Sequence, residues 1–404
     1  MDDPPERSDL TVVGAGVIGL AVARELIARH PGLRICVLER ESRVAAHQSG
    51  HNSGVIHAGV YYAPGSLKAR LCVEGARDLY AFCVEREIPH DRCGKLILAT
   101  SAAELGGLDE LERRARRSGV PGLRRVGPAE VTELEPHARA VAGLHSPTTG
   151  IVDFAAVVLA LADEVRRDGV SIGLGCGVLD VTSAGGRLGL RHARGTHETR
   201  AAVFCAGAWA DRLAVRAGAD PDPRIVPFRG AYLALVEPRR HLVRGLVYPV
   251  PDPRLPFLGV HFTRTMTGTV LIGPSALVVG ARDAYRVGRV RAADLADTLS
   301  WPGSWRMLRR NRRAALVELG HAALPRTLVR AAARLIPGLV LADVEVAFAG
   351  VRAQAVGRDG RLVDDFAFSR TDRALHVRNA PSPGATSALA IARHVADRVD
   401  RELL

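Results

Sequence analysis

The chain has 404 residues, of which 47% are hydrophobic and 24% are charged, so a globular protein with a large core is expected. No apolar run reaches the roughly 18 residues of a membrane-spanning helix, and the polar first nine residues do not have the pattern of a signal peptide. The net charge is +12, yet 53 of the 55 basic residues are arginine and only Lys68 and Lys95 are lysine. This skew is typical of a genome-wide composition bias. Because no recognition motif accompanies the charge, we expect no nucleic-acid partner.

The six cysteines form no CxxC pair. Cys36 and Cys205 lie in apolar, strand-like runs, where a thiol acts as a small hydrophobic group. The cysteine pattern therefore favours a reducing cytoplasm over a disulfide-bonded framework.

Residues 9–20, DLTVVGAGVIGL, have the pattern of a nucleotide-binding fingerprint, in which a buried strand leads into Gly14-x-Gly16-x-x-Gly19 and then into a helix. Gly14 permits the tight turn, Gly16 lets the backbone approach a diphosphate, and Gly19 lets helix and strand pack closely. A second apolar run ends at Glu39, which is placed to accept a hydrogen bond from a ribose hydroxyl. Together these features predict a dinucleotide site.

A polar, glycine-rich loop follows at residues 47–62 and contains His47, His51 and His57. Their spacing comes without a cysteine or carboxylate, so hydrogen bonds that shape the loop explain His47 and His51 better than a metal site does. His57 has apolar neighbours on both sides and is a candidate base. The chain has no second GxGxxG for NADH, which predicts that electrons pass from the substrate directly to a flavin.

The remaining elements follow in chain order. Helices are predicted at residues 17–29, 67–86, 103–117, 154–168 and 385–404, and strands at residues 34–38, 95–99, 170–174, 177–182 and 201–206. Residues 225–280 are strand-rich, and residues 301–335 are helical and basic. This order predicts an α/β protein with a discontinuous, Rossmann-like nucleotide-binding domain (residues 1–90, 145–222 and 340–404). A substrate domain with an antiparallel sheet (residues 91–144 and 223–339) is inserted into it.

Residues 301–319 form a basic amphipathic segment in which five arginines accompany two tryptophans and several leucines. Such a segment either lies on an anionic membrane or covers the substrate sheet as a solvated helix. The sequence leaves both interpretations open. The first would place the protein peripherally at the inner face of the cell membrane.

Six further blocks carry a family resemblance: HQSGHNSGVIHAGVYYAPGSLKARLC, CGKLILAT, PFRGAY, YPVPDPRLPFLGVHFTR, GVRAQAV and NAPSPGATSA. In these blocks, in order from about residue 9 to residue 395, the chain resembles the bacterial L-2-hydroxyglutarate oxidase (dehydrogenase) family. That family belongs to the D-amino-acid-oxidase-like FAD enzymes, so the resemblance makes the Rossmann-like domain an FAD-binding domain. It implies oxidation of L-2-hydroxyglutarate to 2-oxoglutarate by hydride transfer from Cα to the flavin, with oxygen or membrane quinone as the electron acceptor.

Two alternatives remain beside this interpretation. One is a sister flavoenzyme that oxidises another 2-hydroxy acid, an amino acid or glycerol-3-phosphate. The other is a basic flavin-binding protein without catalytic activity.

The family motifs supply candidate catalytic and substrate-binding residues at matching positions. His57 and His261 are the candidate bases, and the sequence does not rank them. Arginine binds a carboxylate through two parallel hydrogen bonds, so it is the expected substrate clamp. The best candidate is Arg352, in Gly350-Val351-Arg352, and the others are Arg229 and Arg264. Tyr61 is a candidate to cap the substrate with its hydroxyl.

Cofactor contacts are expected along the whole chain. The strand at Val178 matches the place where a backbone meets the adenine, and Gly207 ends a strand near the diphosphate. The block at residues 379–387 suits the carbonyl edge of the flavin, or alternatively forms a helix N-cap from Ser382 and Thr386. The full set of expected cofactor contacts is Gly14, Gly16, Gly19, Glu39, Ser49, Asn52, Ser53, Val178, Gly207, Gly350, Pro383, Gly384, Ala385 and Thr386.

Overall fold

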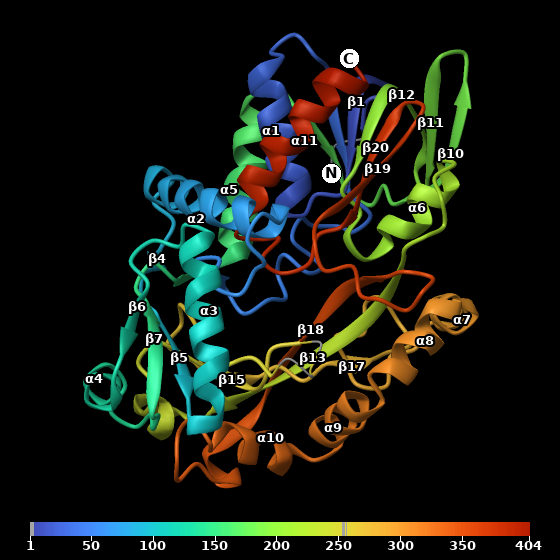
Figure 1. Ribbon diagram of the computed structural model, residues 1–404. Coiled ribbons are helices and arrows are strands. Elements are labelled where there is room, and N and C mark those ends of the chain that lie inside the picture. Colours follow the sequence, from blue (N-terminus) through green and yellow to red (C-terminus); the bar gives the residue numbers. More distant parts are fainter. Residues whose placement is uncertain (1–3, 253–254, 256) are drawn as a thin grey trace.

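A computed structural model describes residues 4–252, 255 and 257–404. Two large sheets lie one above the other in Figure 1, with helices on the outer side of each. A small third sheet, β3-β8-β4, joins short strands from three parts of the chain: β3 (Val55–Ile56), β4 (His90–Asp91) and β8 (Gly150–Val152).

The first sheet has eight strands and contains the fingerprint strand. Its main path is β10-β11-β12-β1-β2-β9, and β20 joins β12 and pairs with β19. The central pairs β1–β12, β1–β2, β2–β9 and β12–β20 are parallel, as expected for a Rossmann-like sheet. The strands are β1 (Arg7–Val13), β2 (Ile35–Leu38), β9 (Ser171–Gly173), β10 (Val178–Ala184), β11 (Arg187–His192), β12 (Gly195–Phe204), β19 (Ala367–Thr371) and β20 (Ala374–Asn379).

Three helices stack side by side over this sheet: α1 (Val17–Arg29), α5 (Phe154–Arg167) and α11 (Ala388–Glu402). On α1, Leu20, Ala23 and Leu26 are fully buried at helical spacing, so one face of the helix joins the core of the sheet. Next to α11 lies α2 (Leu67–Glu85), and α6 (Ala210–Arg216) contacts β10 and β20.

The second sheet has nine strands along the path β17-β13-β16-β15-β14-β5-β7-β6, with β18 on β13. It is antiparallel except for the parallel pair β14–β5. Its strands are β5 (Lys95–Ala99), β6 (Arg124–Val126), β7 (Ala142–Ser146), β13 (Arg224–Leu235), β14 (Leu246–Pro249), β15 (His261–Arg264), β16 (Val270–Gly273), β17 (Leu277–Val278) and β18 (Val344–Val356).

Helices and 3-10 turns border the second sheet. In Figure 1, α8, α9 and α10 run along its lower right side, and α3 crosses it on the other side. The helices are α3 (Leu105–Arg117), α4 (Pro128–Leu134), α7 (Ala292–Ser300), α8 (Pro302–Arg310), α9 (Arg312–Ala323) and α10 (Pro325–Ala332). The short turns are η1 (Ala102–Glu104), η2 (Gly207–Trp209), η3 (Glu237–Leu242) and η4 (Leu341–Asp343).

Several element boundaries differ from the sequence prediction. The predicted division assigned residues 340–404 to the nucleotide-binding domain, but β18 pairs with β13 along almost its whole length and so belongs to the second sheet. Residues 301–335 form three helices, and Pro325 starts the third because proline fits the first helical turn but not a helix interior. The final helix begins at Ala388, three residues later than predicted.

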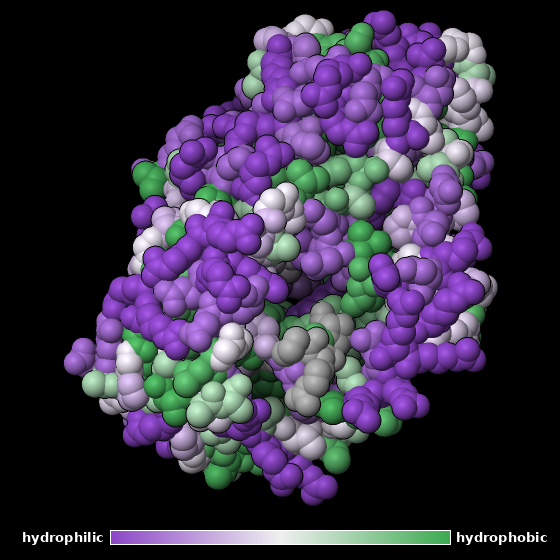
Figure 2. Space-filling view, viewed as in Figure 1, coloured by the Kyte–Doolittle hydropathy of each residue, from purple (hydrophilic) through white to green (hydrophobic). Residues whose placement is uncertain are grey.

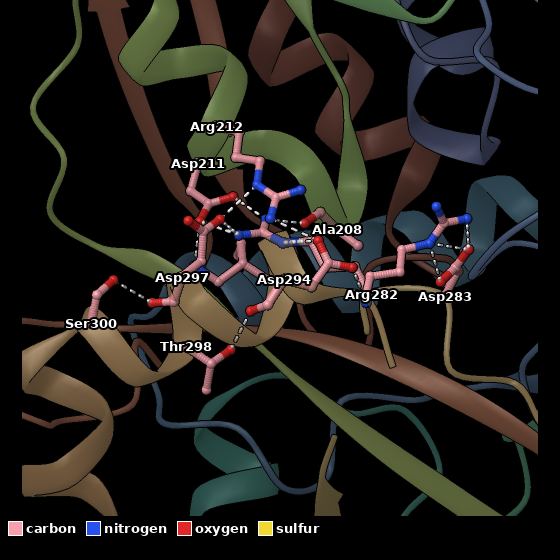
Figure 3. A network of polar contacts seen from close by, with 11 residues as sticks. Ala208, Asp211, Arg212, Arg282, Asp283, Asp294, Asp297, Thr298 and Ser300 are labelled. Carbon is pink, nitrogen blue, oxygen red and sulfur yellow. Dashed lines mark hydrogen bonds and ion pairs between the residues drawn. The ribbon is translucent and has the colours of Figure 1, made fainter. Parts of the chain in front are cut away.

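A buried ion network joins α6 of the nucleotide-binding side to α7 of the second sheet. Figure 3 shows its centre, Arg282, whose side chain is only 1% exposed. The Arg282 guanidinium donates to both carboxylate oxygens of Asp211, to Asp297 and to the backbone carbonyl of Ala208. Its backbone N–H donates to Asp294 at 2.8 Å. The network therefore fixes the chain at Ala208, directly after Gly207, relative to the second sheet.

Candidate active site

A cavity of about 1050 Å³ lies between the two large sheets. Figure 2 shows the surface hollowed between the upper and lower parts of the molecule. This volume is at the upper end of the ~300–1,000 Å³ of small-molecule sites, so an elongated ligand fits better than a compact one. The walls come from the fingerprint, the histidine loop, β13, β18 and the block after β20.

The fingerprint glycines have the geometry that the sequence predicts for them. Gly14 has φ +110°, and a Cβ there would lie 2.5 Å from the carbonyl oxygen of Cys205. A Cβ on Gly19 would lie 1.9 Å from the carbonyl oxygen of Gly14, so α1 can approach β1 only without a side chain there. Gly16, the N-cap of α1, lines the cavity. A phosphate can thus approach the helix N-terminus through the backbone alone.

Glu39 and Ser49 support the glycine turn. The buried Glu39 carboxylate accepts hydrogen bonds from the backbone N–H groups of Ala15, at 2.7 Å, and Glu41, at 2.9 Å. Burial raises the pKa of Glu39, although these two bonds oppose the rise. Ser49 Oγ accepts from Val17 N at 3.0 Å and caps α1, a role that the glycine N-cap cannot perform. Both residues line the cavity.

Hydrogen bonds hold the histidine loop in shape. The Asn52 amide donates to the carbonyls of Gln48 and Ser49 and accepts from Gly54 N. His47 Nε2 lies 2.8 Å from a Glu41 carboxylate oxygen, and His51 stacks on Tyr285 with ring centroids 4.1 Å apart.

Neither His47 nor His51 joins a metal cluster. Across the described part of the chain, no three histidines, cysteines or carboxylates are placed to hold a metal ion. The loop-shaping interpretation of the two histidines agrees with their contacts.

Other expected cofactor contacts also line the cavity: Ser53, Val178, Gly207, Gly350, Pro383, Gly384 and Ala385. At Gly350, a Cβ would lie 2.7 Å from the carbonyl oxygen of His51, so β18 reaches the histidine loop only because this residue is a glycine. Gly207 adopts φ +51° in the turn after β12. These segments close the cavity from three sides.

The block after β20 bonds to the histidine loop and does not cap the last helix. Thr386 Oγ1 accepts from His57 N at 3.1 Å and donates to the Val55 carbonyl at 3.3 Å. Ser382 Oγ lies 3.4 Å from His57 Nε2. The N-cap of α11 is Ser387, and it makes no side-chain capping bond. The alternative of an N-cap formed by Ser382 and Thr386 is therefore wrong, because both hydroxyls bond to the loop instead.

His57 lines the cavity, and its Nδ1 atom is buried without a hydrogen-bond partner among the described residues. Burial lowers the pKa of His57 well below its usual value, and the charges of Lys95, His261 and Lys68 lower it further. The imidazole is therefore neutral at pH 7 and able to accept a proton.

His261 lies behind the cavity wall. Its ring stacks on Tyr248 at a centroid distance of 3.9 Å, and its Nδ1–H donates to the Gly259 carbonyl at 2.7 Å. Burial lowers the pKa of His261 to about 3, with smaller contributions from the charges of Arg352 and Lys95. Of the two candidate bases, His57 lines the described cavity and His261 does not.

The three candidate arginines occupy different places. Arg352 on β18 lines the cavity, and its guanidinium lies 5.1 Å from the centroid of the Phe257 ring. Arg229 pairs with Val351 in the β13–β18 ladder, so its side chain lies on the opposite face from Arg352. Arg264 forms an ion pair with Asp91 and does not line the cavity. Of these three candidates, only Arg352 lines the cavity.

Tyr61 lines the cavity with a buried hydroxyl that has no hydrogen-bond partner within the described structure. Residues 253, 254 and 256, part of the YPVPDPRLPFLGVHFTR block, lie outside the described residues. The sequence patterns also overlook both lysines, which lie in this region with exposed fractions of 7% for Lys68 and 2% for Lys95. Their rarity among 55 basic residues was the available signal.

The cavity fits FAD on three observations. Its lining runs from the fingerprint to the block after β20, and its glycines leave backbone where a Cβ would clash. His57 and Tyr61 line it and each carries a buried polar atom without a partner among the described residues. The uncapped N-terminus of α11 adds N–H groups of the kind that stabilise an electron-rich ring edge.

Comparisons with known proteins agree with this fit. The family model described as FAD dependent oxidoreductase (DAO) matches residues 9–398. The protein named mitochondrial L-2-hydroxyglutarate dehydrogenase from Nematostella vectensis is 46% identical over 98% of this chain and 91% of its own length. The human protein of that name is 41% identical over 97% of this chain and 89% of its own length. L-2-hydroxyglutarate dehydrogenase from Indibacter alkaliphilus is 40% identical over 94% of this chain and 96% of its own length.

Solved structures share the fold. L-α-glycerophosphate oxidase from Mycoplasma pneumoniae, a structure with FAD bound, has a TM-score of 0.80 at 24% identity and covers 98% of this chain and 95% of its own. With the fold, the cavity and the near full-length relatives in agreement, the chain belongs to the FAD-dependent oxidoreductase family and, within it, to the group of the L-2-hydroxyglutarate dehydrogenases.

Proposed function

We propose that the protein oxidises L-2-hydroxyglutarate to 2-oxoglutarate with FAD as its cofactor. The observation that carries the proposal is the identity of 40–46% over nearly the whole chain with proteins named L-2-hydroxyglutarate dehydrogenase. The placement of His57 and Arg352 in one cavity supports it, since a base and a carboxylate clamp are what a 2-hydroxy acid requires.

The proposed chemistry divides the work between these two residues. Arg352 binds the carboxylate next to the alcohol carbon, because no described carboxylate pairs with its guanidinium and its planar fork matches the ligand. His57, whose imidazole is neutral and lines the cavity, takes the hydroxyl proton. FAD, when bound, supplies the acceptor for the hydride that leaves Cα.

Anaerobic mixing of the purified holoenzyme with substrate tests this function. We expect the flavin absorbance near 450 nm, an approximate band position common to flavins, to bleach with L-2-hydroxyglutarate. The D enantiomer, glycerol-3-phosphate and amino acids should leave it oxidised. Bleaching by one of these compounds and not by L-2-hydroxyglutarate would assign the protein to a sister activity.

We infer further that membrane quinone is the electron acceptor, reached through peripheral contact of α8 and α9 with an anionic membrane. Among the described residues, no helix has both the length and the apolar character to span a bilayer. Four exposed arginines adjoin three exposed apolar side chains on these helices: Arg309, Arg310, Arg312, Arg313, Leu316, Val317 and Leu319. Basic and apolar groups on one surface suit an anionic interface.

Trp301 does not take part in this surface, because it is 2% exposed and its indole donates to the Val356 carbonyl. Co-sedimentation with phosphatidylglycerol vesicles tests the contact. We expect binding that is lost in 0.5 M salt and in an Arg309→Glu/Arg313→Glu variant. Arg77→Glu on α2 is the control, because the Arg77 side chain is 76% exposed and lies outside this surface. Equal binding to neutral vesicles would contradict it, and would leave oxygen as the acceptor.

A further inference from the structure

Lys95 is a buried ammonium on the face of β5 that lies against Tyr61, a residue of the cavity wall, and Lys95 itself is not part of the cavity lining. Side chains alternate along a strand, so Lys95, Ile97 and Ala99 share one face, whereas Leu96 and Leu98 pack into the opposite core. The Lys95 face belongs to the cluster that includes Tyr248 and contacts Tyr61. An apolar residue is the usual occupant of such a position, because an isolated charge is costly to bury.

The contacts of the Lys95 ammonium are aromatic. Its Nζ lies 4.5 Å from the centroid of the Tyr248 ring and 5.1 Å from that of the Tyr61 ring. Within the described residues, no carboxylate forms an ion pair with it, although the side chain is only 2% exposed. The tyrosine faces offset part of the cost of burying this charge, but a carboxylate would offset more of it.

The surroundings place this ammonium beside the reaction site. Tyr61, one of its two aromatic contacts, lines the cavity, and the Lys95 charge acts on both His57 and His261. The charge of Arg352 also acts on His261. Two cations, one on β18 and one on β5, therefore lie near the same histidine.

We propose that Lys95 binds the second carboxylate of the substrate, the one farthest from the alcohol carbon, so that Arg352 and Lys95 together select a dicarboxylic 2-hydroxy acid. This inference rests on the proposed function. A monocarboxylic 2-hydroxy acid would engage Arg352 and leave the buried ammonium without an anion. Specificity then follows from the charge that stays unpaired when the wrong substrate binds.

Three other cations considered for a substrate carboxylate are paired or lie on another face. Lys68 lines the cavity, but its Nζ lies 2.9 Å from a carboxylate oxygen of Asp364. Arg264 is paired with Asp91, and Arg229 lies on the far face of β13. Of these four cations, Lys95 is the one that acts on both histidines without a carboxylate partner among the described residues.

Protonation of Lys95 gives the inference a pH signature. Burial lowers the pKa of Lys95 from 10.5 to about 8. The ammonium form dominates below that value, and a carboxylate ligand stabilises it. Affinity for a dicarboxylate should therefore fall as the pH rises through about 8, while affinity for the matching monocarboxylate should not.

Two substrates of equal carbon length test the inference: L-2-hydroxyglutarate and L-2-hydroxyvalerate, which carries a methyl in place of the far carboxylate. In anaerobic flavin reduction, Lys95→Met is expected to lower kcat/KM for the diacid about 10- to 100-fold, the loss typical of one charge-assisted hydrogen bond. The value for the monoacid should change less than about 3-fold. Lys95→Arg should retain part of the preference, because it keeps the charge.

Lys68→Met is the matched control, since it removes the only other lysine. It should affect both substrates alike. A selective loss of diacid activity in Lys68→Met but not in Lys95→Met would overturn the proposal. Equal losses for both substrates in Lys95→Met would also overturn it and would leave Lys95 a structural role.

A binding measurement keeps the inference testable if Lys95→Met does not fold. Flavin absorbance changes report the Kd of 2-oxoglutarate and 2-oxovalerate for the wild-type holoenzyme between pH 7 and 9. If the Kd of 2-oxoglutarate rises with pH and that of 2-oxovalerate does not, the result supports the role of Lys95. If both Kd values change with pH in the same way, the proposal is overturned. If L-2-hydroxyglutarate does not reduce wild-type flavin at all, the proposed function fails first, and the two failures are thus distinguishable.

Discussion

The two sides of the cavity are built in different ways. On the nucleotide-binding side, backbone groups form the wall, and Gly14, Gly16 and Gly19 act through the absence of a side chain. On the substrate side, charged and aromatic side chains from separate segments converge: Arg352 and Tyr61 line the cavity, and Lys95 lies against the Tyr61 ring. Local chain geometry determines the structure of the first side, whereas the pairing register of the strands determines which side chains meet on the second. Substitutions should therefore affect cofactor retention on one side and rate or selectivity on the other.

The largest effect is expected from Gly19→Val on the backbone side. A Cβ there would lie 1.9 Å from the Gly14 carbonyl oxygen, so α1 must move away from β1 and the diphosphate site is lost. We expect protein purified without bound flavin, measured as the ratio of flavin to protein absorbance. Gly32→Ala is the control, because a Cβ at that residue would have no atom within 4 Å. Full flavin content in Gly19→Val would show that the fingerprint does not determine cofactor binding.

Substitutions on the substrate side should slow flavin reduction without loss of bound flavin. His57→Gln removes the proposed base, and a general base typically contributes about 10²- to 10⁴-fold. Anaerobic stopped-flow reduction should slow by that factor at unchanged flavin content. His261→Gln, behind the wall, should slow it by about tenfold or less. The reverse order of effects would exchange the roles of the two histidines.

The buried ion network that connects the two sides can be disrupted by substitution of Arg282. Arg282→Leu leaves the Asp211 carboxylate buried without its cation, which typically costs about 3–5 kcal/mol, whereas Asp294 keeps its ion pair with Arg212. Urea unfolding monitored by circular dichroism measures this loss. The control is Arg289→Leu, whose side chain is 43% exposed beside Asp283, since a surface ion pair of this kind contributes little to stability. Equal destabilisation by both variants would mean that the buried network contributes no more to the free energy of unfolding than a surface ion pair does.

The smallest effect concerns pH. Because burial lowers the pKa values of His57 and His261 below 6.5, both rings stay neutral where a free histidine would begin to protonate. The kcat/KM for flavin reduction should therefore be flat from about pH 7.5 to about 6 and should decline only at lower pH. A decline centred near 6.5 would indicate a base with an unperturbed pKa and would point to a more solvated residue.

The same contrast explains what the sequence can predict. The fingerprint, α1 and its glycine roles follow from residues within one short segment, and α1 has the predicted bounds. The family, cofactor and α/β fold agree with the comparisons. By contrast, the opposite orientation of Arg229 and Arg352 depends on the pairing of β13 with β18, which no local pattern reveals. The arginine abundance also hides which guanidinium is functional.

Long-range contacts are the second limit on prediction from sequence. Thr386 bonds to the backbone of His57 across 329 residues, so neither residue's neighbours indicate the contact. The same holds for Lys95, which meets Tyr248 only because β5 and β14 pair in parallel. The individual roles of the site residues remain predictions until the variants above are measured.

The bond between Thr386 and the histidine loop also bears on how the protein is made. A ribosome releases the fingerprint and the loop early, whereas Thr386, which bonds to the backbone of His57, emerges 329 residues later. Until then, the apolar face of α1 that packs on α11 stays uncovered. During that interval the N-terminal segment exposes apolar surface and is a natural client for a chaperone.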